Sequence, residues 1–315
     1  MGEKHGTDLL GAAVSPLVAG AVAGGATRRR VLGVFTTCVY VELGAHDRVL
    51  ALLASDALHL PIGLRLAVPS SALSWGVQPG DEVVVGAGRV VLPAHEVVAA
   101  RLARPSRVRA TTWVPTPADA VRLPDPGVLG DLTRDLTRTA LAGRPLDAAV
   151  RGLVGAGRGL TPSGDDALCG VLLALASVEH PDAARTLAAL RAQLAKALGR
   201  TTSLSAALLA AAASGYAVPD VVRLVTLLAA AGSTGRNDTP GTPGTSSVAG
   251  RAGAIPRVDP RPDRTAYDLA LEGVLAIGHT SGRDLLSGVA GALLALAHAL
   301  DPSPTTPPPE GAHRA

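Results

Sequence analysis

Two polar loops, each followed at once by an apolar helical pattern, hold the residue types that could do chemistry in this chain. The first loop reads Gly-Leu-Thr-Pro-Ser-Gly-Asp-Asp at 159–166, and two adjacent carboxylates could carry a proton or bind a metal ion. The second reads His-Thr-Ser-Gly-Arg-Asp at 279–284. Residues 163–171 and 281–289 share the pattern S-G-x-D-x-L-x-G-V, with six identities in nine positions. We therefore expect two related helix entrances that could face one another.

Both loops are suited to begin a helix and to bind an anion. Ser163 and Asp166 have the spacing of a capping box, and the glycines let the backbone turn and expose its N–H groups. The N-terminal end of a helix dipole favours a phosphate or a carboxylate. The acidic residues oppose an anion unless a metal ion or an arginine lies between. Alternatively, both loops are only well-capped helix starts.

The candidate site residues divide according to the role that their chemistry allows. Proton transfer, or metal binding, is assigned to Asp165, Asp166, Asp284 and His279. Anion binding needs cations, hydroxyl donors and glycines that permit close approach; the candidates are Arg158, Gly159, Thr161, Ser163, Gly164, Thr280, Ser281, Gly282 and Arg283. Thr202 and Ser203 form a third polar helix entrance, where ordinary capping is the favoured interpretation.

A magnesium site is an alternative use of the acidic residues. Mg²⁺ commonly takes one or two carboxylates together with a substrate phosphate. If Asp166 and Asp284 cap their helices, only Asp165 and His279 are free as ligands, so we assign no metal ligand set and keep Mg²⁺ as a cofactor that could bind. The first loop is neither a phosphate-binding loop nor a dinucleotide fingerprint, because no Gly-Lys-Ser/Thr follows and the glycine spacing differs.

Composition limits the class of protein. The 315 residues are 47% hydrophobic but only 2% aromatic, so the core must be built from Ala, Leu and Val. The net charge of +3 comes from scattered arginines, without the basic face and aromatic residues of a nucleic-acid-binding protein. The only cysteines, Cys38 and Cys169, are far apart, which fits a reducing compartment. The most apolar stretches, 167–178 and 285–300, are shorter than the ~20 residues that span a bilayer. We expect a soluble, cytoplasmic protein that does not bind a membrane.

The spacing of the apolar residues predicts an α+β fold with a small N-terminal β-rich domain and an all-helical C-terminal domain. Residues 1–30 are expected to be a flexible N-terminus with, at most, a short helix at 9–22. Residues 31–115 predict an antiparallel sheet or barrel; its short Val- and Leu-rich runs are 31–43, 49–53, 63–68, 82–85 and 89–92, and 108–114 could close the sheet. From 125 to 300 the apolar period is about 3.6, which indicates helices. Residues 232–264 predict a disordered insertion, and 301–315 a Pro-rich tail.

Three blocks of this sequence resemble the signature blocks of the DUF2877 family, which includes the oxamate carbamoyltransferase subunit AllH. The blocks are residues 159–170 (GLTPSGDDALCG), 201–205 (TTSLS) and 277–288 (IGHTSGRDLLSG). The likeness spans about residues 30–300, although Ala167 and Arg283 stand where the family usually carries aromatic residues. It implies a multi-subunit transferase of purine catabolism, in anaerobic allantoin degradation. The implied reaction converts oxalurate and phosphate to oxamate and carbamoyl phosphate.

The same resemblance implies partners and roles for the polar residues. The substrate would be a small anion such as phosphate, carbamoyl phosphate or an oxamate-like molecule, and the other partners would be subunits of a hetero-oligomer. Arg158 or Arg283 could hold a carboxylate, and His279 could move a proton. The hydroxyl groups of both loops could hold phosphate. A non-catalytic ligand-binding or assembly subunit is the alternative, and Mg²⁺-dependent phosphoryl transfer is a third.

Overall fold

The structure, a computed structural model, describes residues 8–44, 48–234 and 264–300. The predicted Pro-rich tail lies outside these residues. Of the predicted insertion, only 232–234 and 264 are described, at the end of one helix and the start of the next. The rest of that prediction also lies outside the described residues.

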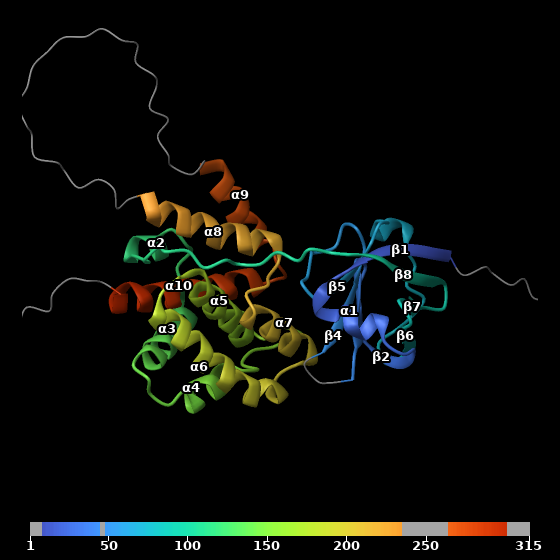
Figure 1. Cartoon of the computed structure of the whole chain (residues 1–315), viewed down its shortest axis with the longest axis horizontal. Coiled ribbons are helices and arrows are strands. Elements are labelled where there is room, and N and C mark those ends of the chain that lie inside the picture. The colour runs from blue at the N-terminus through green and yellow to red at the C-terminus, as the bar shows by residue number, and fades with distance from the viewer. Residues whose placement is uncertain (1–7, 45–47, 235–263, 301–315) are drawn as a thin grey trace, which may run out of the picture.

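The N-terminal part is a closed barrel of eight strands, which confirms the predicted β-rich fold (Figure 1). The strands are β1 (Asp8–Val14), β2 (Thr27–Val34), β3 (Cys38–Glu42), β4 (Val49–Leu53), β5 (Gly63–Leu66), β6 (Glu82–Gly86), β7 (Arg89–Val91) and β8 (His95–Leu102). Around the barrel they follow the order β1-β5-β4-β3-β2-β6-β7-β8. The pairs β1–β8 and β4–β5 are parallel and the others are antiparallel, so the barrel is mixed.

Three details of the β-rich part differ from the prediction. The run at 31–43 contributes to two strands, β2 and β3, because the chain turns at residues 35–37. The helix expected at 9–22 is wrong in its first half: β1 occupies 8–14, and helix α1 (Pro16–Ala23) begins only after Ser15, whose side chain accepts a hydrogen bond from the Leu17 N–H. The expected flexible N-terminus therefore contains a strand and a helix.

Residues 108–114 do not close the sheet, which corrects the prediction. β1 and β8 close it by pairing along seven residues of each strand. Near 108–114 the chain makes only isolated bridges, Arg107 with Tyr216 and Thr111 with Val178. Trp113 is buried in the core of the helical region. Within the segment only Val108 and Trp113 are buried, and residues 109–112 are exposed, so it is a connecting segment anchored to the helical core at two points.

The C-terminal part is helical, as predicted, and contains helices α2 to α10 among the described residues. They are α2 (Pro117–Val121), α3 (Gly127–Leu141), α4 (Asp147–Leu153), α5 (Ser163–Ser177), α6 (Pro181–Ala197), α7 (Ser203–Ala213), α8 (Pro219–Thr234), α9 (Arg264–Leu275) and α10 (Ser281–Leu300). Helices α5 and α10 pack closely together in the middle, with α3 beside them (Figure 1). The core is built from Leu, Val and Ala.

Helix α10 corrects the expectation about apolar stretches, since its 20 residues are long and apolar enough to cross a membrane. Most of its apolar stretch is buried inside the protein, where it contacts α5 and α3. This is the burial of a core helix, and it explains the apolar composition without a bilayer.

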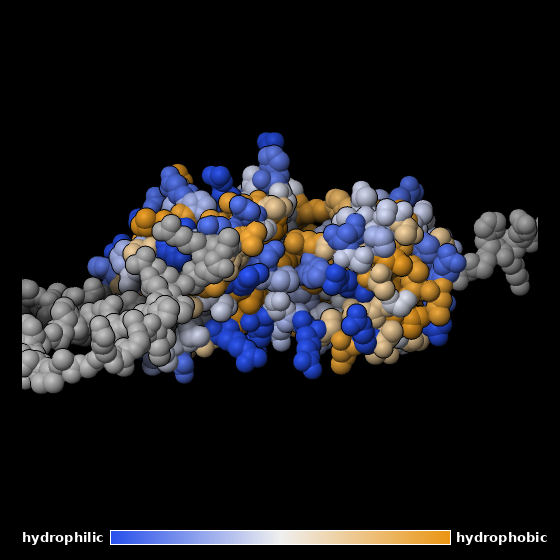
Figure 2. All heavy atoms as spheres, turned by 90° about the horizontal axis from the view of Figure 1, so that it is seen from above, coloured by the Kyte–Doolittle hydropathy of each residue, from blue (hydrophilic) through white to orange (hydrophobic). Residues whose placement is uncertain are grey.

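Helix α7 joins the two parts of the molecule. Leu204, Ala207 and Ala211 on α7 belong to the same buried cluster as the barrel strands. On the face seen in Figure 2, hydrophobic residues gather at the junction between the two parts and over a portion of the barrel. The apolar contact thus places the barrel next to the entrances of α5 and α10.

Candidate functional site

The two helix entrances lie side by side, as the repeat predicted. Thr161 Oγ1, in the loop before α5, is 2.9 Å from the Oγ of Ser281, the first residue of α10. Behind the entrances the helices touch through glycine. A Cβ on Gly170 would lie 2.0 Å from the Leu285 carbonyl oxygen, and one on Gly288 would lie 1.9 Å from that of Ala167.

These glycine contacts are reciprocal in terms of the repeat. Position by position, Gly170 corresponds to Gly288 and Ala167 to Leu285. In each copy, the second glycine therefore packs against the fifth residue of the other copy. Two halves related by a twofold axis make contacts of this kind. The repeated sequence accordingly encodes a close helix crossing, and this crossing brings the polar loops together.

The capping box expected at Ser163 and Asp166 is wrong. Pro162 occupies the N-cap position of α5, with an extended ψ of 143°, so Ser163 is already helical. The N–H groups of Asp165 and Asp166 donate to the Pro162 carbonyl, and the Gly164 N–H donates to that of Ala156. These N–H groups are thus engaged within the protein, and Asp166 can turn towards the other entrance.

Asp165 is buried, 1% exposed, and holds the surrounding loops together. One carboxylate oxygen accepts a hydrogen bond from the Gly155 N–H at 2.9 Å. The other accepts hydrogen bonds from the hydroxyls of Thr201 and Ser205, the latter at 2.8 Å. Three donors from two separate segments satisfy the charge. Asp165 therefore connects the loop before α5 to the start of α7.

The third polar entrance is a helix cap, as favoured from the sequence. Thr202 is the N-cap of α7, where its hydroxyl accepts a hydrogen bond from the Ser205 N–H at 3.0 Å. The same hydroxyl donates to the Leu160 carbonyl at 2.5 Å. Thr202 therefore fixes the first polar loop, and Ser203 is the first residue of the helix.

Asp166 is the acidic residue that the structure turns towards a cavity. Burial raises the pKa of Asp166 to about 7, hydrogen bonds with Ser281 and Thr161 oppose the rise, and the charges of Asp284 and Asp165 add to it. In the described part of the chain, Asp166 Oδ2 and Asp284 Oδ2 are buried without a hydrogen-bond partner. Near neutral pH, Asp166 can therefore both donate and accept a proton.

The cavity beside Asp166 lies between the barrel and the helical region and has a volume of about 350 Å³. Its helical wall contains Thr161, Asp166 and Ser281. The barrel wall consists of residues that the sequence analysis did not select; they include Phe35, Cys38, Tyr40, Leu58 and Leu60. A smaller pocket of about 80 Å³ adjoins it and is also lined by Asp166 and Ser281. A mostly apolar cavity with a few convergent polar groups is typical of small-molecule sites.

The other predicted site residues lie elsewhere around the entrances. Arg158, Gly159, His279, Thr280 and Arg283 are exposed, and none of them is among the described residues that line the cavity. The first glycines of the two copies are used in packing: a Cβ on Gly164 would lie 2.1 Å from the Leu153 carbonyl oxygen, and one on Gly282 would lie 1.8 Å from that of Val274. Within the described ranges, no group of three or more His, Cys, Asp or Glu side chains could hold a metal ion.

Comparison with known proteins adds one match to this geometry. No curated protein and no solved structure matches the chain. The matching segment, 153–240, contains Asp165, Asp166 and the start of α7. Over these residues the chain matches the family model described as "Oxamate carbamoyltransferase subunit AllH", which confirms the family resemblance for the segment that holds the first polar loop.

Proposed function

We propose that this chain is a subunit of an oxamate carbamoyltransferase-type enzyme and acts in the cytoplasm with other subunits of a hetero-oligomer. The observation that carries the proposal is the family match over 153–240, because this segment contains the acidic pair of the site. The proposed reaction converts oxalurate and phosphate to oxamate and carbamoyl phosphate. Its two substrates are small anions, in keeping with the size of the cavity.

In this proposal, the cavity beside Asp166 holds the carbamoyl end of oxalurate. A phosphate oxygen attacks the carbamoyl carbon, and the bond from this carbon to the oxamate nitrogen breaks. The proton of hydrogen phosphate must reach the leaving nitrogen. Asp166, with its pKa near 7, can accept the proton of hydrogen phosphate and donate it to the leaving nitrogen. Thr161 and Ser281 can hydrogen-bond the carbamoyl group.

The anionic groups of the substrates are assigned to the outer side of the two entrances. Arg158 and Arg283 are exposed in the two loops, and each can pair with a carboxylate or a phosphate. His279, Thr280 and Ser163 can add hydrogen bonds to these groups. Because several helix N–H groups already donate to carbonyls, we assign the charge neutralisation to these side chains and to residues of other subunits.

The test uses the complex that copurifies with this chain through an affinity tag. Carbamoyl phosphate formed from oxalurate and phosphate is measured for the unmodified complex and for Asp166→Asn, which keeps the size of the side chain but cannot carry the proton. We expect kcat to fall by about 100-fold or more, with the complex intact. The exposed acid Asp135 on α3 provides the matched control, and Asp135→Asn should keep full activity.

Other outcomes would favour the alternatives. Full activity in Asp166→Asn would exclude the proton-transfer role. No activity in the unmodified complex, although it assembles, would contradict the proposed reaction and favour a ligand-binding or assembly subunit. Activity abolished by a chelator and restored by Mg²⁺ would favour the third, metal-dependent interpretation of the acidic residues.

A further inference from the structure

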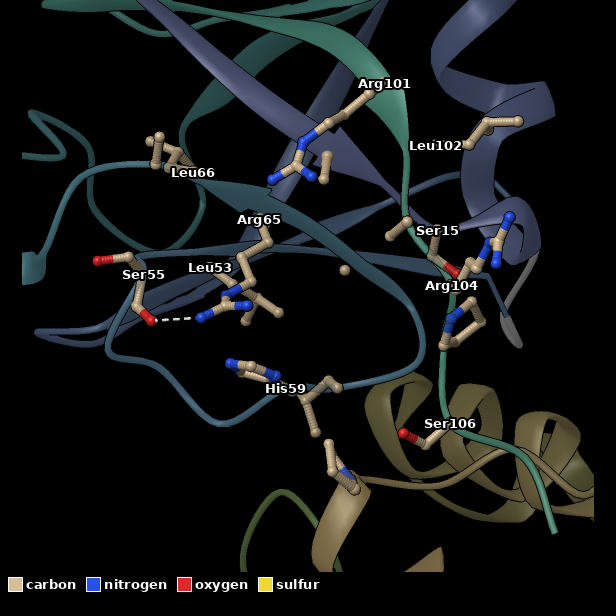
Figure 3. A pocket seen from close by; sticks show the side chains of 17 residues that line it. Ser15, Leu53, Ser55, His59, Arg65, Leu66, Arg101, Leu102, Arg104 and Ser106 are labelled. Carbon is tan, nitrogen blue, oxygen red and sulfur yellow. Dashed lines mark hydrogen bonds between the residues drawn. The ribbon is translucent and has the colours of Figure 1, made fainter.

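A second cavity has a volume of about 690 Å³ and shares Leu53 and Leu60 with the lining of the cavity beside Asp166. It is bordered by barrel strands, by the segment after β8 and by Pro219 at the start of α8 (Figure 3). Four basic residues line it: His59, Arg65, Arg101 and Arg104. The described residues that line this arginine cleft include no Asp or Glu. The cleft is thus concave, of small-molecule size and positively charged.

Strand register explains why two of the arginines share one face. Ala13 on β1 pairs with Arg65 on β5 on one side and with Arg101 on β8 on the other. Residues that are directly opposite one another in a sheet point to the same face, and neighbouring strands are about 4.8 Å apart. The two arginines therefore stand on opposite sides of Ala13, with their Cα atoms roughly 10 Å apart. The small side chain of Ala13 leaves the space between them open.

The side chains are held so that positive charge faces the cleft. Arg65 Nη2 donates a hydrogen bond to the Ser55 carbonyl at 2.8 Å, which fixes the guanidinium. Figure 3 shows Arg65 next to His59 and Arg101 directed towards the same space, whereas Arg104 extends away from them. Arg65 Nε is buried and, within the described residues, has no hydrogen-bond partner. An unused donor of this kind is an expected feature of a site that awaits an acceptor.

Two other arginines of the same barrel have acidic partners, whereas Arg29 and Arg30 on β2 are in none of the ion pairs of the described residues. Arg28 pairs with Glu82 at 3.2 Å, and Arg89 pairs with Glu96, in both cases across neighbouring strands. Among the ion pairs of the described residues, none involves Arg65, Arg101 or Arg104. Two like charges on one face repel each other, and an anion between them would remove this repulsion.

We propose that the arginine cleft binds a small molecule through a phosphate group. Two guanidinium groups match the double negative charge of phosphate, and their planar donor forks suit its oxygens. A single carboxylate would leave one positive charge uncompensated. The proposal does not rest on the carbamoyltransferase function, because Arg65 and Arg101 line this cleft and do not line the cavity beside Asp166.

Isothermal titration of the purified full-length chain with inorganic phosphate tests the proposal directly. We expect saturable binding of one phosphate per chain at the cleft, in addition to any phosphate bound at the entrances of α5 and α10, with weaker binding of acetate at the same ionic strength and weakening as salt increases. Arg101→Gln should reduce the affinity about tenfold or more, which corresponds to the loss of one charge-assisted contact. Arg101 is exposed, and an unchanged thermal unfolding midpoint would show that the variant folds. Arg191→Gln, on an exposed position of α6, is the matched control and should bind as well as the unmodified chain.

A second titration, with glycerol 3-phosphate, distinguishes free phosphate from a phosphorylated molecule. Tighter binding of the ester would identify a phosphorylated ligand, and tighter binding of inorganic phosphate would identify the free anion; either supports the cleft when Arg101→Gln weakens it. Two results would overturn the proposal. One is no saturable binding of either probe, and the other is equal phosphate affinity in Arg101→Gln and the unmodified chain. Arg65→Lys, which keeps the charge but loses the fork, should also weaken binding.

Discussion

Replacing Asp165 with alanine should destabilise the protein strongly, because this buried carboxylate accepts hydrogen bonds from three donors. A hydrogen bond to a charged group contributes about 1.5–3 kcal/mol, but the contributions do not add fully. The Thr201 and Ser205 hydroxyls can rotate, whereas the Gly155 N–H is fixed in the backbone. We therefore expect the free energy of unfolding to fall by about 3–5 kcal/mol.

Urea unfolding followed by circular dichroism measures this change. Asp165→Asn should cost less, about 2 kcal/mol, because the remaining carbonyl oxygen can keep the bond from the Gly155 N–H while the new NH₂ group faces the two hydroxyls, which must rotate to accept from it. Asp135→Ala, at an exposed position of α3, is the control and should change the free energy of unfolding by less than about 0.5 kcal/mol. If Asp165→Ala also stays within about 1 kcal/mol of the unmodified chain, Asp165 does not hold the loops together.

Two further predictions concern the helix crossing and the buried acid. Gly170→Ala should lower the free energy of unfolding by at least 1–3 kcal/mol, because the new Cβ would lie 2.0 Å from the Leu285 carbonyl oxygen. Gly199→Ala is the control, since a Cβ there would have nothing within 4 Å. Equal stability of the two variants in urea would refute a close crossing. Because the folded pKa of Asp166 is raised from 3.8 to about 7, the folded state binds this proton more tightly. The contribution of Asp166 to stability should therefore be fully present below pH 3.8 and be lost as pH rises to about 7. The shift corresponds to at most about 4 kcal/mol, and urea midpoints between pH 4 and 8 should show a flatter profile for Asp166→Asn than for the unmodified chain; identical profiles would contradict the raised pKa.

The sequence predicted most of the middle strands of the barrel, but it did not predict β1, the strand that closes the barrel by pairing with β8. Residues 49–53 match β4, and the predicted runs at 63–68, 82–85 and 89–92 overlap β5, β6 and β7, since Val- and Leu-rich runs between turn residues are a local signal. β1 (DLLGAAV) carries glycine and alanine, which favour no strand by themselves. Its strand conformation results from pairing with β5 and β8, and this pairing depends on tertiary contacts. A similar dependence on tertiary structure makes 108–114 a connecting segment.

The candidate site was predictable only on its helical side. Asp166 and Ser281 belong to the repeat and Thr161 lies in the loop directly before its first copy, so their proximity follows from a pattern in the sequence. The barrel wall of the cavity has no such signal: Phe35 and Tyr40 have the composition of ordinary strand and turn residues. They reach Asp166 only because α7 packs against the barrel. The arginine cleft was missed for the same reason, since Arg65 and Arg101 become neighbours through the strand order.

The barrel also explains why only one of the two similar helix entrances contributes its acidic residue to the cavity. The repeat places Asp166 and Asp284 at equivalent positions, and the reciprocal glycine contacts pack each helix against the same position of the other. Only Asp166 is among the described residues that line the cavity beneath the barrel. The preceding position differs as well, because Asp165 is buried and bonded to α7, whereas its counterpart Arg283 is exposed. A symmetric helix pair thus provides the scaffold, and the asymmetric placement of the barrel and α7 selects one acid for the cavity.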